Sequence, residues 1–65
     1  MTNKVREKRI ERLMSQEELA KKAGVSRQTI IAIESGRCRH TSALTLAKIA
    51  KALCCPMGEI FIYHE

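Results

Sequence analysis

The chain has 65 residues, with 12 Lys or Arg against 7 Asp or Glu, so its formal net charge is +5 and its isoelectric point is about 9.5. A hydrophobic content of 45% indicates one small globular domain over residues 1–65 and argues against intrinsic disorder. No apolar run approaches the roughly 20 residues of a membrane span, and the N-terminus lacks the apolar stretch of a signal peptide, so we expect a soluble, cytoplasmic protein.

The first helix is expected over residues 4–13. Val5, Arg9 and Leu13 recur at every fourth position, and Ile10 joins this stripe from the adjacent row, as in an amphipathic helix. Charged residues fill the remaining positions and indicate a side that faces solvent.

Two short helices joined by a tight turn are expected next. Ser15, followed three residues later by Glu18, forms a capping box that begins a helix over residues 16–23. Gly24 suits the positive φ of a helix exit, and Ser26 caps a third helix over residues 27–35, which Gly36 ends. Two helices that cross closely need small and apolar side chains where they meet. The sequence has such side chains at the required positions: Leu19, Ala20, Ala23, Val25, Ile30 and Ile33. This spacing is the helix-turn-helix pattern, and the alternative is a generic helical hairpin in a small bundle.

The C-terminal part continues as helix. Ser42 caps a fourth helix over residues 43–53, whose inward residues are Leu46, Ile49, Ala50 and Leu53. Pro56 suits the first turn of a fifth helix over residues 57–61, although the β-rich residues 59–63 could instead end as a short strand. The predicted fold class is therefore all-α, a compact five-helix domain.

The third helix begins with polar side chains on its outward face. In a helix-turn-helix motif this end enters the major groove of duplex DNA. Arg can bind guanine, Gln can bind adenine, and an apolar side chain can meet a thymine methyl group. The candidates for contact with base edges are Arg27, Gln28, Thr29, Ile31 and Ala32. The alternative is a solvated polar helix start.

Candidates for contact with DNA phosphates surround this helix. Helix N-termini offer N–H groups to anions, and loop arginines offer positive charge. The candidates are Gln16, Ser26, Arg37, Arg39 and Ser42. The basic net charge favours a polyanionic partner, and the presence of only one Tyr and one Phe argues against single-strand binding by base stacking.

Three segments, SQEELA (15–20), GVSRQTI (24–30) and IESGR (33–37), resemble the Cro/cI-type (XRE-family) helix-turn-helix repressors. LAKIAKAL (46–53) and EIF (59–61) are similar to the last two helices of that family, so the resemblance covers nearly the whole chain. It implies a lambda-repressor-like fold without a separate sensor domain. It also implies a homodimer that binds a palindromic operator in double-stranded DNA as a transcriptional regulator, most simply a repressor.

The resemblance further implies a salt bridge between Arg9 and Glu34 that fixes the third helix, the alternative being a free surface carboxylate at Glu34. The chain departs from the family pattern at three positions. Thr41 stands where a proline often precedes the fourth helix, Cys54 replaces the usual glycine after that helix, and Gly58 lies in the fifth.

Four apolar residues remain once the core is assigned: Leu44, Cys55, Ile62 and Tyr63. A cluster of surplus apolar residues on a small domain predicts a two-fold interface, unless these residues close the core instead.

Other function classes are disfavoured. The sequence has no nucleophile–base pair, carboxylate pair or glycine-rich phosphate loop, so we do not expect an enzyme. Three cysteines, two of them adjacent, suit neither a disulfide framework nor a zinc site, and no cofactor or metal is expected. The rival function is a protein-binding module on the same fold, such as the antitoxin of a toxin–antitoxin pair.

Overall fold

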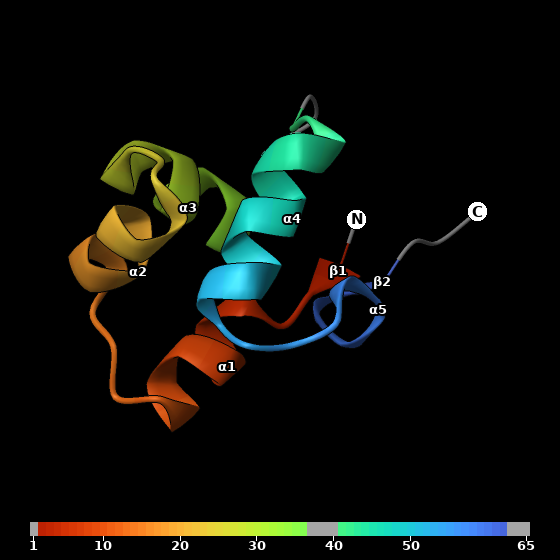
Figure 1. Ribbon diagram of the computed structural model, residues 1–65, viewed down its shortest axis with the longest axis horizontal. Helices are drawn as coiled ribbons and strands as arrows, with labels where there is room; N and C mark the ends of the chain where they lie inside the picture. Colours follow the sequence, from red (N-terminus) through yellow and green to blue (C-terminus); the bar gives the residue numbers. More distant parts are fainter. Residues whose placement is uncertain (1, 37–40, 63–65) are drawn as a thin grey trace.

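The computed structural model of the chain describes residues 2–36 and 41–62. Over these residues it contains helices α1 (Val5–Glu11), α2 (Gln16–Ala23), α3 (Arg27–Glu34), α4 (Ala43–Ala52) and α5 (Met57–Ile60), with two-residue strands β1 (Thr2–Asn3) and β2 (Phe61–Ile62). The all-α fold class is confirmed, and the chain takes the predicted short strand after a fifth helix that ends at Ile60. α2 and α3 lie together on one side of α4, while α5 and the two strands lie on the other (Figure 1).

The core is built from apolar residues of every helix, and α2 packs against both α3 and α4. All the inward residues predicted for the second, third and fourth helices are buried, and Val25 packs against them from the turn. Removing this apolar surface from water is the main force that holds such short helices, which are unstable in isolation. The buried set is Val5, Leu19, Ala20, Ala23, Ile30, Ile33, Leu46, Ile49, Ala50, Leu53, Ile60 and Phe61.

The apolar stripe predicted for the first helix is wrong. Only Val5 of that stripe's apolar members is buried, whereas Ile10 is 52% exposed and Leu13 is 91% exposed. α1 ends at Glu11, and Leu13 follows with φ of 55°, so the chain turns before the stripe can complete a further helical turn. Spacing alone could not reveal this early exit, because no glycine marks it.

Four helices end with a residue of positive φ: Leu13, Gly24, Gly36 and Cys54. After α4 the Cys54 N–H donates to the Lys51 carbonyl at 3.0 Å, and the Cys55 N–H donates to the Ala50 carbonyl at 3.1 Å. This is the Schellman arrangement that satisfies the last carbonyls of a helix. Cys54 therefore adopts the left-handed conformation of the glycine that it replaces, at a conformational cost of about 1–2 kcal/mol.

The two short strands tie the N-terminal segment to the end of α5. Thr2 pairs with Ile62 and Asn3 with Phe61 in antiparallel register, and the Lys4 N–H donates to the Ile60 carbonyl at 2.8 Å. The Asn3 amide also donates to the Ile33 carbonyl at 2.8 Å, which links this ladder to the end of α3. No helix within the described residues is long and apolar enough to cross a membrane.

Candidate nucleic-acid interface

Local hydrogen bonds fix the turn between α2 and α3. The Ser15 hydroxyl accepts from the Glu18 N–H at 3.0 Å, and the Glu18 carboxylate accepts from the Ser15 N–H at 3.2 Å, so the predicted capping box is present. Gly24 has φ of 70°, and the Val25 N–H donates to the Ala20 carbonyl at 3.0 Å. Ser26 then caps α3 by accepting from the Thr29 N–H at 3.2 Å. The two helices thus form the helix-turn-helix unit that the sequence predicts.

α3 has a buried face and an outward face. Ile30 and Ile33 are fully buried against the core. On the opposite side Arg27 and Gln28 are exposed, and Ile31, on the same face as Arg27, is 42% exposed. The other two candidates for base contact are less accessible, because Ala32 is half-buried and the half-buried Thr29 has its hydroxyl 2.8 Å from that of Ser26. The outward face of α3 is therefore defined by Arg27, Gln28 and Ile31.

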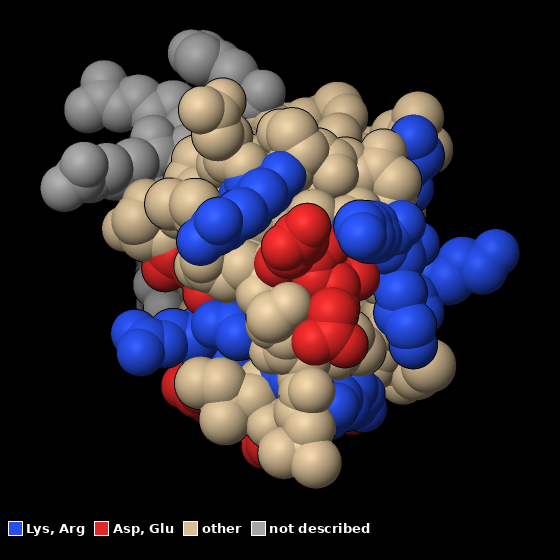
Figure 2. All heavy atoms as spheres, turned by 90° about the vertical axis from the view of Figure 1, so that its left-hand side faces the viewer, with Lys and Arg blue, Asp and Glu red and all other residues tan. Residues whose placement is uncertain are grey.

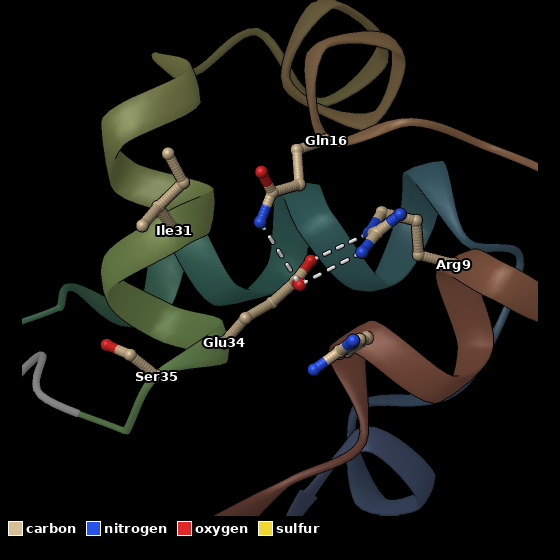
Figure 3. A pocket seen from close by; sticks show the side chains of 6 residues that line it. Arg9, Gln16, Ile31, Glu34 and Ser35 are labelled. Carbon is tan, nitrogen blue, oxygen red and sulfur yellow. Dashed lines mark hydrogen bonds and ion pairs between the residues drawn. The ribbon is translucent and has the colours of Figure 1, made fainter.

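An ion pair between Arg9 of α1 and Glu34 of α3 holds the end of α3. The Arg9 Nε donates to Glu34 Oε2 at 2.8 Å and its Nη2 donates to Oε1 at 3.2 Å (Figure 3). The Arg9 side chain is 12% exposed and that of Glu34 is 5% exposed, and Arg9 also donates to the Met14 carbonyl at 2.8 Å. The Gln16 amide reaches Glu34 Oε1 at 3.4 Å, so the carboxylate joins α1, α2 and α3. This is the pair that the family resemblance implies.

Two hollows flank this ion pair. The larger, of about 460 Å³, lies between α1, the start of α2 and α3, as Figure 3 shows, and is lined by Arg6, Arg9, Gln16, Ile31, Glu34 and Ser35. The smaller, of about 310 Å³, is lined by Arg9, Ser15, Gln16, Glu17 and Arg27. Gln16 and Arg9 border both hollows, so the start of α2 lies between the cations of α1 and the first residue of α3.

Arg6 is a further candidate that the sequence does not single out. The charge pattern predicts that it faces solvent on the first helix, but it lines the larger hollow together with Ile31. Its position one turn before Arg9 was the available signal, because residues three apart share a helix face. Neither Arg6 nor Arg27 has an ion-pair partner among the described residues, so both charges are available to an anionic ligand.

The face that α2 and α3 present carries charges of both signs. Figure 2 shows acidic side chains near its centre, with Lys and Arg side chains on several sides of them. With a net charge of +5, the basic side chains outnumber the acidic ones over the chain. A chain with this net charge attracts a polyanion, and the acidic residues on this face limit where the polyanion can lie.

The remaining candidates for phosphate contact are only partly described. Ser26 and Ser42 are exposed N-caps, and the Ser42 hydroxyl accepts from the Thr45 N–H at 3.2 Å. Arg37 and Arg39 lie outside the described residues.

The candidates for the dimer interface differ in their exposure, and one of them is not described. Leu44 is 66% exposed, whereas Cys55 is half-buried against the core and its Sγ accepts from Arg12 Nη2 at 3.1 Å. The backbone of Ile62 lies in β2, and Tyr63 lies outside the described residues. Among residues 2–36 and 41–62, no three His, Cys, Asp or Glu side chains come together as metal ligands could.

Comparisons with known proteins agree with this geometry. A family model described as helix-turn-helix matches residues 5–60. The chain is 50% identical to an HTH-type transcriptional regulator of Methanocaldococcus jannaschii and 44% identical to the HTH-type transcriptional regulator YgzD of Bacillus subtilis, and each alignment covers 100% of this chain and 97% of the relative. Among solved structures it is similar to a chain of the SinR protein/SinI protein complex, with a TM-score of 0.77 and 30% identity. That alignment covers 83% of this chain and 52% of the solved chain, so this chain spans about half of its length.

Proposed function

Because this chain belongs to the XRE-type helix-turn-helix family of transcriptional regulators, we propose that it is a repressor that binds a palindromic operator as a homodimer. The observation that carries the proposal is the outward face of α3, where Arg27, Gln28 and Ile31 are exposed on a helix fixed by buried partners. A repressor of this kind occupies its operator and thereby excludes polymerase. It meets that operator in the cytoplasm.

The outward face of α3 has the chemistry for reading bases. The Gln28 amide can donate to adenine N7 and accept from N6, and the Arg27 guanidinium can donate to guanine O6 and N7. Each such bidentate contact discriminates by about 1–3 kcal/mol against a wrong base. Ile31 meets a thymine methyl group, and Thr29 and Ala32 flank these contacts at the edges of the groove.

Phosphate contacts hold α3 in register. Gln16 at the first position of α2 presents backbone N–H groups and an amide to one phosphate, while Arg6 across the larger hollow supplies a charge to the same strand. Ser26 and Ser42, at the starts of α3 and α4, offer further polar contacts. Arg37 and Arg39 complete the proposed set, because they follow α3 in the sequence.

The proposed homodimer forms through the C-terminal half of the chain. Leu44 is a large exposed apolar side chain, and with Cys55, Ile62 and Tyr63 it supplies the apolar surface of a two-fold contact. Two copies of α3 would then lie about 34 Å apart, one turn of DNA, which matches a palindromic operator.

A protein-binding module of the antitoxin kind is the second candidate function. The observation that favours it is that the similar SinR chain is solved in a complex with the SinI protein. The two functions are compatible, since a protein partner can bind a regulator that also binds DNA.

Selection of bound sites from random duplex DNA, followed by fluorescence anisotropy on the selected site, tests the proposal. We expect an enriched site with two-fold symmetry. Gln28→Ala should lose preference at one base pair per half-site, whereas Arg6→Ala should weaken binding to all sequences alike and lower the salt slope by about one. Lys8→Ala removes a charge from the same helix outside both hollows and serves as the matched control. Absence of any enriched sequence would contradict the proposal.

A further inference from the structure

A third hollow lies away from the outward face of α3. It has a volume of about 380 Å³, opens between the end of α2 and the second half of α4, and is lined by Lys22, Ala23, Lys48, Lys51, Ala52 and Cys54. It shares no lining residue with the two hollows at the start of α2. At a rise of about 1.5 Å per residue, the two ends of α2 are roughly 10 Å apart. We call this feature the lysine hollow.

Three positively charged side chains line the lysine hollow without acidic partners among the described residues. Lys22, Lys48 and Lys51 are all exposed, and none has an ion-pair partner among the described residues. No carboxylate lines the hollow. The helix dipole favours lysines in a last turn, which accounts for Lys22 and Lys51 separately. It does not account for Lys48, nor for the convergence of three lysines from two helices.

The buried part of the lining, which we call the floor of the hollow, is apolar and consists of small side chains. Ala23 is 6% exposed and Ala52 is half-buried and packs against the core, whereas Cys54 is exposed at the α4 exit. An apolar floor with a cationic rim is complementary to a segment that carries apolar side chains between carboxylates.

We propose that the lysine hollow docks an acidic segment of a partner protein. A second copy of this chain docked with the two-fold axis passing through the hollow would oppose lysines with lysines. Duplex DNA would leave the apolar floor unpaired, because its outer surface is a phosphate backbone. The hollow lies apart from the residues proposed to contact DNA, so the partner can bind while an operator is held. This inference rests on the second candidate function, for which it names a surface and a partner chemistry, and that surface shares no residue with those proposed to contact DNA.

An NMR titration of the full, ¹⁵N-labelled chain tests the proposal. The probe is a synthetic amphipathic peptide of Glu, Ala and Leu, and its counterpart with Gln in place of Glu is the neutral control. We expect the acidic peptide to shift the amide signals of Lys22, Lys48, Lys51 and Ala52 without shifting that of Gln28. The neutral peptide should leave all five unchanged.

Charge reversal at the hollow provides the matched comparison. Lys48→Glu should weaken binding of the acidic peptide by about five- to ten-fold, because it replaces an attraction with a repulsion. Lys4→Glu changes the net charge equally on an exposed residue outside the hollow and should change the affinity less than about two-fold. Both variants should bind a selected operator equally well, so failure here is distinguishable from failure of the proposed function.

Four results would overturn the inference. Equal losses of peptide affinity in Lys48→Glu and Lys4→Glu would mean that net charge alone attracts the peptide. Amide shifts centred on α3 would mean that the peptide binds the face proposed to contact DNA. The same shifts on addition of random duplex DNA would make the hollow a second DNA contact. A change in self-association of Lys48→Glu by analytical ultracentrifugation would make it an interface between copies.

Discussion

Replacing Glu34 by Gln removes the negative charge at the point where α1, α2 and α3 meet. In the native chain this carboxylate accepts two hydrogen bonds from Arg9, at 2.8 and 3.2 Å, and one from Gln16 at 3.4 Å. Since the Glu34 and Arg9 side chains are only 5% and 12% exposed, the substitution leaves the Arg9 charge without its partner in a largely buried position.

The size of the effect follows from this burial. Removing one partner of a buried ion pair costs about 3–5 kcal/mol, and an amide that keeps one acceptor oxygen reduces the loss, so we expect about 2 kcal/mol for Glu34→Gln. Arg9→Met should cost about 3 kcal/mol, because it also leaves the Met14 carbonyl without its donor. The double variant should cost about 3 kcal/mol, which gives a coupling energy of about 2 kcal/mol. A chain of this length has a total stability of only about 3–10 kcal/mol.

Urea denaturation followed by circular dichroism measures these changes in the free energy of unfolding. In a thermal melt, the Tm of Glu34→Gln should fall by about 10 °C. Glu11→Gln is the matched control, because Glu11 pairs with Lys8 and Arg12 at 3.7 and 3.8 Å with a side chain that is 60% exposed. It should cost less than about 0.5 kcal/mol. A coupling energy between Arg9 and Glu34 as small as that of an exposed pair would refute the reasoning.

Three further substitutions test other parts of the account. Leu13→Gly should raise the free energy of unfolding by about 0.5 kcal/mol, because it relieves the positive φ of a 91% exposed residue, whereas Leu13→Ala keeps the strain and should give no gain in the same urea assay. Cys54→Gly should stabilise for the same reason, and an unchanged denaturation midpoint would argue against strain at that exit. Ser15→Ala should cost about 1 kcal/mol by removing the acceptor for the Glu18 N–H, while Ser15→Asp keeps an acceptor and should cost less than about 0.5 kcal/mol. Equal losses in the two Ser15 variants would show that the cap is not the cause.

Local signals made the central helices predictable. α2 begins and ends where the capping box and Gly24 predict, because both devices act within four residues of the helix end. α1 and α4 end earlier than the sequence predicts, because Leu13 and Cys54 adopt a left-handed conformation without being glycine. β1 was missed because a two-residue strand is defined by its partner, and that partner, Phe61–Ile62, lies at the other end of the chain.

The candidate site shows the same division between local and long-range signals. The position of Arg27 and Gln28 on the exposed face of α3 follows from helix periodicity, which can be seen in the sequence itself. The spacing of Arg6 from Arg9 indicates that the two share a helix face, but the position of Arg6 beside Ile31 depends on how α1 packs against α3, which no local pattern specifies. The lysine hollow likewise forms only when the ends of α2 and α4 meet.

Photo-crosslinking on a selected operator tests most directly whether the outward face of α3 reads duplex DNA. A photoreactive amino acid would be placed in turn at position 28, on that face, and at position 48, in the lysine hollow. We expect position 28 to crosslink to bases of the major groove at two symmetry-related points of the operator, with no crosslink from position 48. Crosslinks from position 48 together with none from position 28 would contradict the account.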